Sequence, residues 1–233
     1  MCTRFVFRGE SDIVTGFNFD IDLAVWDHRL IVENDRFYIG ILRPDRLRHG
    51  YHGVHANGNA GTLLYVHGDP AGAYRAEADC VTVADLTEDF ISGALAFDDV
   101  RALLTCKTVT YAPDATMQAM LTDARGRTLI IEPGIGWREE KASRFSLITN
   151  YSLIDPPRTA PYIVPGDDRY ARAQALLAAN GNDLSVADAL EVLATVRQEG
   201  AWATRLSFVY SQREQAVTYC ENGDFTQTRK VVF

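Results

Sequence analysis

The chain has 233 residues, of which 47% are apolar and 10% are aromatic. A chain of this size and composition can bury one substantial core, so we expect a single domain over residues 1–233. The formal net charge of −8 argues against binding to nucleic acid or to an anionic membrane and leaves a homo-oligomer open. The sequence contains neither a run of about 18 apolar residues nor a signal peptide, which predicts a cytoplasmic protein.

The first third of the chain predicts six short strands before any helix. Residues 3–7 and 13–19 alternate around a break at 10–12, which is the pattern of a β-hairpin. Further strands are expected at 30–32, 37–42, 53–56 and 62–66.

The rest of the chain alternates between helices and strands. Apolar spacing predicts helices over 86–94 and 100–104, and then a hairpin over 117–132 whose turn contains Gly126. A short strand at 146–149 leads to a proline-rich irregular connection over 155–166. Two helices follow at about 168–180 and 185–200, the second with Ser185 as its N-cap and Asp188 three residues on. Closing strands are expected at 206–210, 216–220 and 229–233. This order predicts an α+β fold in which two sheets pack together and helices cover both outer faces.

The four cysteines lack the spacing of a zinc ribbon or a disulfide framework. Cys80, Cys106 and Cys220 are expected to be small buried hydrophobic residues. Cys2 differs because removal of Met1 would give it a free α-amine beside its thiol. An α-amine within reach of a nucleophile can serve as its general base, so such a cysteine needs no histidine.

The opening of the chain resembles that of a known enzyme family. Cys2 is followed by a hairpin and then by the stretch Gly16-Phe17-Asn18-Phe19-Asp20-Ile21. This arrangement is similar to the start of the choloylglycine hydrolase and penicillin V acylase family, which are linear-amide hydrolases of the N-terminal-nucleophile superfamily. In that family an aspartate contacts the α-amine of the catalytic cysteine, and Asp20 matches it.

Four later motifs extend the resemblance over about 170 residues. They are the hairpin at 53–59, the strand ending in Ile130-Ile131-Glu132, the segment Leu147-Ile148-Thr149-Asn150, and Pro165-Gly166-Asp167 followed by Arg169-Tyr170-Ala171-Arg172-Ala173. The resemblance implies a four-layer αββα sandwich. It also implies that Asn150 lies near the scissile carbonyl and that Arg169 closes the catalytic cluster.

Further site residues come from the same resemblance. Tyr65 stands near the position of an expected oxyanion donor, and Asn18, Phe17 and Trp26 are expected to contact substrate. Two of these depart from the family pattern, because Phe17 replaces an arginine and Tyr65 replaces an asparagine. Trp26 and Tyr65 are equally consistent with packing in the core.

A group of histidines at 49, 52, 55 and 67 raises the question of a metal site. Gly50 and Gly53 indicate a loop leading into a strand, and the two-residue period of a strand would separate the ligands. We therefore expect no metal and no cofactor.

The sequence thus predicts hydrolysis of a linear amide bond in an N-acylated small molecule by Cys2, after Met1 removal. Two alternatives stay open: a catalytically silent binding or structural protein with the same fold, and an acyltransferase that uses the same residues.

Overall fold

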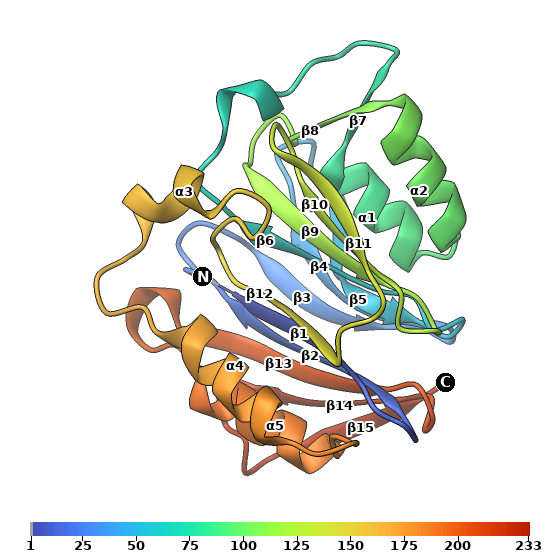
Figure 1. Cartoon of the computed structure of the whole chain (residues 1–233), viewed down its shortest axis with the longest axis vertical. Helices are drawn as coiled ribbons and strands as arrows, with labels where there is room; N and C mark the ends of the chain where they lie inside the picture. The colour runs from blue at the N-terminus through green and yellow to red at the C-terminus, as the bar shows by residue number, and fades with distance from the viewer. Residues whose placement is uncertain (1) are drawn as a thin grey trace.

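The computed structural model describes residues 2–233, so the predicted loss of Met1 lies outside the described residues. Most of the fold consists of two antiparallel β-sheets that face each other, with helices against their outer faces (Figure 1). No helix within residues 2–233 combines the length and the apolar character needed to cross a bilayer.

The first sheet contains both ends of the described chain. Its strand order is β12-β1-β2-β13-β14-β15, and all neighbouring strands are antiparallel. The bounds are β1 Thr3–Arg8, β2 Ile13–Asp20, β12 Phe145–Ile148, β13 Thr204–Ser211, β14 Ala216–Glu221 and β15 Arg229–Val232. The hairpin of β1 and β2 is central, which brings the start of β1 beside the end of β2.

The second sheet has seven antiparallel strands in the order β11-β10-β9-β6-β5-β4-β3. Their bounds are β3 His28–Val32, β4 Arg36–Leu42, β5 Arg48–His55, β6 Ala60–Tyr65, β9 Met117–Thr122, β10 Thr128–Glu132 and β11 Gly136–Glu140. Gly126 has a φ of +75° in the turn between β9 and β10, a conformation that favours glycine. The predicted hairpin at this place is therefore confirmed.

The helices divide between the two sheets. Helix α1 packs against β5, β6 and β9 and also contacts α2, whereas α4 and α5 pack against the first sheet (Figure 1). The bounds are α1 Val83–Ile91, α2 Phe97–Cys106, α3 Pro156–Thr159, α4 Arg169–Ala179 and α5 Val186–Thr195, with 3-10 turns η1 Pro70–Gly72, η2 Ala160–Tyr162 and η3 Gly200–Trp202. Ser185 caps α5 as predicted, because its hydroxyl accepts a hydrogen bond from the Asp188 amide.

Aromatic side chains join the two sheets. Phe17 and Phe208 of the first sheet lie with ring centroids 5.6 Å apart, and Phe208 meets Phe37 of the second sheet at 5.5 Å. All three rings are fully buried, so they remove much apolar area from water at the centre of the molecule.

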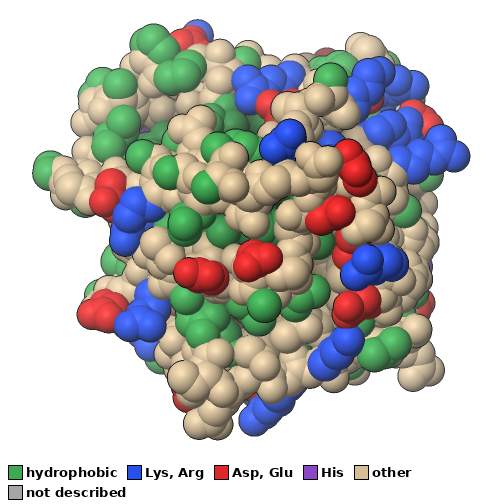
Figure 2. All heavy atoms as spheres, turned by 60° about the horizontal axis from the view of Figure 1, so that its bottom comes forward, with side chains coloured by type: hydrophobic (Ala, Val, Ile, Leu, Met, Phe, Trp, Pro, Cys, Tyr) green, Lys and Arg blue, Asp and Glu red, His purple; other side chains and the backbone are tan. Residues whose placement is uncertain are grey.

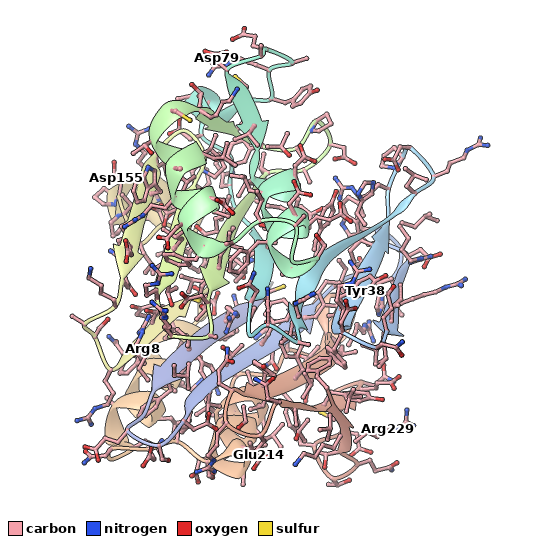
Figure 3. The ribbon with its side chains drawn as sticks, turned by 90° about the vertical axis from the view of Figure 1, so that its right-hand side faces the viewer. Arg8, Tyr38, Asp79, Asp155, Glu214 and Arg229 are labelled. Carbon is pink, nitrogen blue, oxygen red and sulfur yellow. The ribbon has the colours of Figure 1, made fainter. Side chains whose placement is uncertain are left out.

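A polar contact also joins the sheets at the end of β1 that is farther from Cys2. Arg8 of β1 donates to the Gly126 carbonyl at 2.6 Å, to Thr128 at 2.7 Å and to Ser146 at 2.9 Å (Figure 3). Because these partners lie on or next to β10 and on β12, Arg8 fixes one sheet against the other.

The sequence misses the short strands β7 Cys80–Thr82, β8 Thr108–Thr110 and β11, which are only partly buried. The prediction for two cysteines is also wrong. Cys106 is exposed near the end of α2 and Cys80 is half-buried, whereas Cys220 is buried as expected. On the face shown in Figure 2, acidic and basic side chains are interspersed among apolar ones.

Candidate active site

Cys2 immediately precedes β1 and is buried. Its backbone nitrogen donates a hydrogen bond to Asn150 Oδ1 at 2.8 Å, and its Sγ lies 3.8 Å from the Asp20 carbonyl oxygen. Both the thiol and the nitrogen of the predicted nucleophile are therefore held by residues that the sequence analysis selected.

Asn150 follows β12 and contacts three parts of the chain. Besides accepting from Cys2, its Oδ1 accepts from Arg169 Nη2 at 3.2 Å. Its Nδ2 donates to the Tyr65 carbonyl oxygen at 2.7 Å. One amide group thus links the start of β1 to the end of β6 and to helix α4.

Arg169 is the first residue of α4, and its side chain is almost completely buried. Its Nη1 donates to the Cys2 carbonyl oxygen at 2.9 Å. Its Nε and Nη2 each donate to Asp167 at 2.8 Å, a paired geometry that suits arginine and a carboxylate. A cation is disfavoured at a helix N-terminus, so the neighbouring carboxylates offset both the helix dipole and the burial.

Asp20 ends β2 and lies 3.7 Å from the Arg169 guanidinium. Thr204 of β13 pairs with Asp20 across the sheet, and its hydroxyl donates to Asp20 Oδ1 at 2.6 Å. Burial outweighs these contacts and raises the pKa of Asp20 to about 7. Asp20 can therefore gain or lose a proton near neutral pH.

The thiol of Cys2 is shielded from water as well. Burial raises its pKa to about 11, and the nearby Asp20 carboxyl also acts to raise it. At neutral pH almost all of the thiol is protonated, so reaction as a nucleophile requires a local proton acceptor.

A small apolar cavity of about 20 Å³ lies beside Cys2. Tyr65 and Trp26, both predicted site residues, line it, and their rings are 5.9 Å apart. The other lining residues are Phe19, Asp20, Ile21, Ile41, Arg43, Tyr51, His52, Leu63 and Met117. Burial raises the pKa of Tyr65 to about 12, so its hydroxyl keeps its proton and can act as a donor.

Two predicted substrate contacts are not among the residues that line this cavity. Phe17 packs between the sheets, where its ring stacks on His52 at 5.1 Å. Asn18 is fully buried toward α5, where it donates to the Leu193 carbonyl at 2.8 Å and accepts from Ser207 at 2.7 Å. The structure therefore brings Cys2, Asp20, Asn150, Arg169, Tyr65 and Trp26 together but leaves Phe17 and Asn18 in packing positions.

The four histidines considered for a metal have different surroundings. His49 hydrogen-bonds to Asp45 and Glu88, and His52 contacts two phenylalanine rings of β2. His55 faces Asp35, and His67 stacks on Tyr162. Within residues 2–233 the one group with metal-ligand geometry is a largely exposed cluster formed by Glu77, Asp79 and Cys80, which contains no histidine.

Sequence reasoning missed three residues of the site. Asp167, two residues before Arg169, orients its guanidinium, and the motif Pro165-Gly166-Asp167 drew attention to the segment without assigning that role. Thr204 becomes a partner of Asp20 only through strand pairing over 184 positions. Arg43 lines the cavity from the turn between β4 and β5, a position with no local motif.

No protein-family model and no curated protein matches the chain by sequence. Three solved structures are similar over nearly its whole length. The C2A mutant of conjugated bile acid hydrolase from Clostridium perfringens gives a TM-score of 0.69 at 12% identity, covering 100% of this chain and 92% of that one. Penicillin V acylase from Agrobacterium tumefaciens gives 0.65 at 17% identity, covering 94% and 83%.

The third is the Caenorhabditis elegans ortholog of N-acylethanolamine-hydrolyzing acid amidase, with a TM-score of 0.61 at 16% identity and 100% coverage of both chains. The chain has the fold of these three enzymes. The resemblance inferred from the sequence is thereby confirmed at the level of fold, as is the mixture of α and β structure.

Proposed function

We propose that this chain is an amide hydrolase of the choloylglycine hydrolase and penicillin V acylase type, with an αββα sandwich and an N-terminal cysteine nucleophile exposed by removal of Met1. The observation that carries the proposal is the environment of Cys2. Its nitrogen contacts Asn150, its carbonyl contacts Arg169 and its sulfur lies near Asp20, all beside an apolar cavity.

In the first step, the α-amine of Cys2 takes the thiol proton while Sγ attacks the carbonyl carbon of the amide. The raised pKa of the thiol makes this transfer necessary, and both groups belong to one residue. The tetrahedral intermediate then collapses, the C–N bond breaks, and the amine leaves with the proton that the α-amine returns to it.

In the second step, water attacks the thioester carbonyl and gives up a proton to the same α-amine. The C–S bond breaks, the carboxylic acid leaves, and the thiol regains its proton. The chemistry therefore needs one base near the sulfur and a donor for the oxyanion.

The surrounding residues support these steps. Asn150 holds the Cys2 nitrogen, and its Nδ2 has a second N–H besides the one bonded to Tyr65 O. That N–H and the Tyr65 hydroxyl are the donors that we assign to the oxyanion. Arg169 and Asp20 hold Cys2 and set the charge around its amine.

We assign an N-acylated small molecule as the substrate. The names of the three structural neighbours support this class, since each denotes a hydrolase, acylase or amidase. The apolar lining of the small cavity beside Cys2 supports placement of a short acyl group there.

The test combines intact-mass analysis with a panel of N-acyl substrates. We expect the mature chain to begin at Cys2 and to release amine from at least one substrate, and Cys2→Ala to abolish the release. Cys106→Ala is the matched control, because Cys106 is exposed on α2 away from the site and its loss should leave the rate unchanged.

The two alternatives give different results. An acyltransferase would form the acylated product when an acceptor amine is added, at the expense of the free acid. A silent protein would release no amine from any substrate and would form no thioester at Cys2, and this result would overturn the proposal.

A further inference from the structure

Two cavities meet at Arg43. One is the small cavity of about 20 Å³ beside Cys2, and the other is a pocket of about 390 Å³ that opens at the surface. Arg43 and Tyr51 line both. The surface pocket is also lined by Pro44, Asp45, His49, Tyr74, Thr82, Ala84, Asp85, Ala112, Pro113 and Asp114.

The two volumes suit different ligands. A space of about 20 Å³ holds roughly one water molecule, whereas small-molecule sites usually measure about 300–1,000 Å³. The surface pocket is in that range but does not include Cys2 among its lining residues. A long acyl group can reach Cys2 through this pocket only if the boundary between the two cavities is displaced.

Two aromatic rings and one carboxylate hold Arg43 in this boundary. Its guanidinium carbon lies 4.3 Å from the centre of the Trp26 ring and 5.6 Å from that of Tyr51. It also lies close enough to the Tyr65 hydroxyl to act on its pKa, and it forms an ion pair with Asp114. The Arg43 side chain is only 5% exposed, so its charge is largely out of water and the Asp114 carboxylate is its counter-ion.

We infer that Arg43 is a specificity-determining residue that limits the length of the acyl group and restricts the chain to amides of short acids such as acetic acid. This rests on the proposed function. The side chain closes the inner cavity on the side of the surface pocket, and Asp114 anchors it there. Removing Arg43 joins the two cavities and admits longer, unbranched acyl groups.

Arg43 is the movable part of the boundary. It lies just after β4 in the turn to β5, and Asp114, which is 26% exposed, belongs to a loop. Tyr51 lies within β5 at a bulge, and its neighbours Gly50 and His52 both pair with β4 and hold the strand around it. Substitutions at Arg43 and Asp114 therefore change the boundary with little effect on the sheets.

The first test measures access to Cys2 without any need for catalysis. Peptide-resolved mass spectrometry follows alkylation by iodoacetamide, which is small, and by N-phenylmaleimide, which is bulky. The exposed Cys106 of the same molecule is the internal reference. We expect Arg43→Ala to raise the N-phenylmaleimide rate at Cys2 at least tenfold and the iodoacetamide rate by much less.

One further variant separates the roles of size and charge, and another serves as the control. Asp114→Asn keeps the arginine but removes its counter-ion, so we expect an intermediate gain. Arg29→Ala changes an exposed arginine of β3 and should leave both rates unchanged. Equal rates for the bulky reagent in the wild type, Arg43→Ala and Asp114→Asn would overturn the inference, whether or not the chain hydrolyses amides.

The second test compares kcat/KM for N-acetyl to N-octanoyl amides of one amine. The wild type should prefer the shortest acyl group, and Arg43→Ala should shift the ratio of octanoyl to acetyl by about tenfold or more, a usual size for discrimination by an apolar pocket. A wild type that prefers octanoyl amides would contradict the inference and leave the proposed function intact. No turnover by any variant would contradict the proposed function, and the alkylation rates would still decide the role of Arg43.

Discussion

The side chain of Asn150 bridges the nitrogen of Cys2, just before the first sheet, and the carbonyl of Tyr65 in the second, at 2.8 and 2.7 Å. Both ends of the amide are used, so the orientation of Cys2 depends on the packing of one sheet against the other. Arg169 adds a third contact to the same amide oxygen.

Substitution of Asn150 by leucine should therefore disable the site. It removes the acceptor for the Cys2 nitrogen and the donor assigned to the oxyanion, and loss of one such donor lowers kcat by roughly 10²–10³-fold. Asn150→Asp keeps an acceptor but loses the donor, so it should be impaired as well. The measurement is kcat/KM on the best substrate of the panel.

The control for this pair is Asn182→Leu, which changes an exposed asparagine after α4. Its kcat/KM should stay within about twofold of the wild type, as expected for a surface substitution. If Asn150→Leu retained wild-type activity, the role assigned to Asn150 would be wrong.

Asp20 should make the protein less stable as the pH rises from about 4 to about 7. Its pKa is about 7 in the folded chain, against an ordinary value of 3.8, so over this range the folded state binds more protons than the unfolded state. The free energy of unfolding then falls with increasing pH. A difference of about 3 pKa units corresponds to at most about 4 kcal/mol.

The measurement is urea unfolding of the wild type and Asp20→Asn at pH 4.5 and pH 7.5. The asparagine variant cannot ionise here, so it should lack this decrease, and the comparison cancels the contributions of the other carboxylates. Equal pH dependence in the two proteins would mean that Asp20 titrates near its ordinary pKa.

The sequence could predict those parts of the site that depend on local pattern. The hairpin of β1 and β2 is visible as alternation, and its geometry already brings Asp20 close to Cys2. Because successive side chains of a strand point to opposite faces of the sheet, the sequence also predicts that Asn18 and Phe17 lie on opposite faces. The partner of Asn18 is a carbonyl of α5, 175 residues later, and no local signal reveals that contact.

The Arg43 position illustrates the same limit. Three arginines lie at 43, 46 and 48, and nothing in their spacing tells which one points inward. Arg43 does so because Trp26, Tyr51 and Asp114 converge on it from three separate segments. The sequence also fails to predict the short strand β11, because its half-buried residues show no apolar alternation.

Thr204→Val tests the support of Asp20. The threonine hydroxyl donates to Asp20 at 2.6 Å and accepts from the Gln198 amide at 2.8 Å. Valine keeps the shape but leaves buried polar groups without their partner, which costs about 1–3 kcal/mol. We also expect the pKa of Asp20 to rise further, because this hydrogen bond acts to lower it.

Thr204→Ser is the matched variant, because it retains the hydroxyl. Urea unfolding at pH 7.5 should place its stability between those of the wild type and Thr204→Val. A valine variant as stable as the wild type would show that the hydroxyl contributes little to holding Asp20.

The buried Arg4 side chain should lower the stability of the fold, whereas the Arg8 side chain should raise it. Its side chain is fully buried in β1, it donates to the Phe5 carbonyl, and within residues 2–233 its Nε and Nη2 have no hydrogen-bond partner. Burial lowers the pKa of Arg4 to about 9. Replacement of buried ionic groups by apolar side chains of similar volume is often neutral or stabilises a protein by about 1–4 kcal/mol.

We therefore expect Arg4→Met to raise the urea midpoint at pH 7, with an unchanged m-value. Arg8→Met is the matched control and should lower it, because Arg8 loses hydrogen bonds that join the two sheets. The pH dependence supplies a second criterion. The pKa of Arg4 is lower in the folded chain than in the unfolded chain. As the pH rises above about 9, the free energy of unfolding of the wild type should therefore increase relative to that of Arg4→Met. A midpoint that falls in Arg4→Met would mean that the guanidinium makes favourable contacts inside the sandwich that outweigh its desolvation.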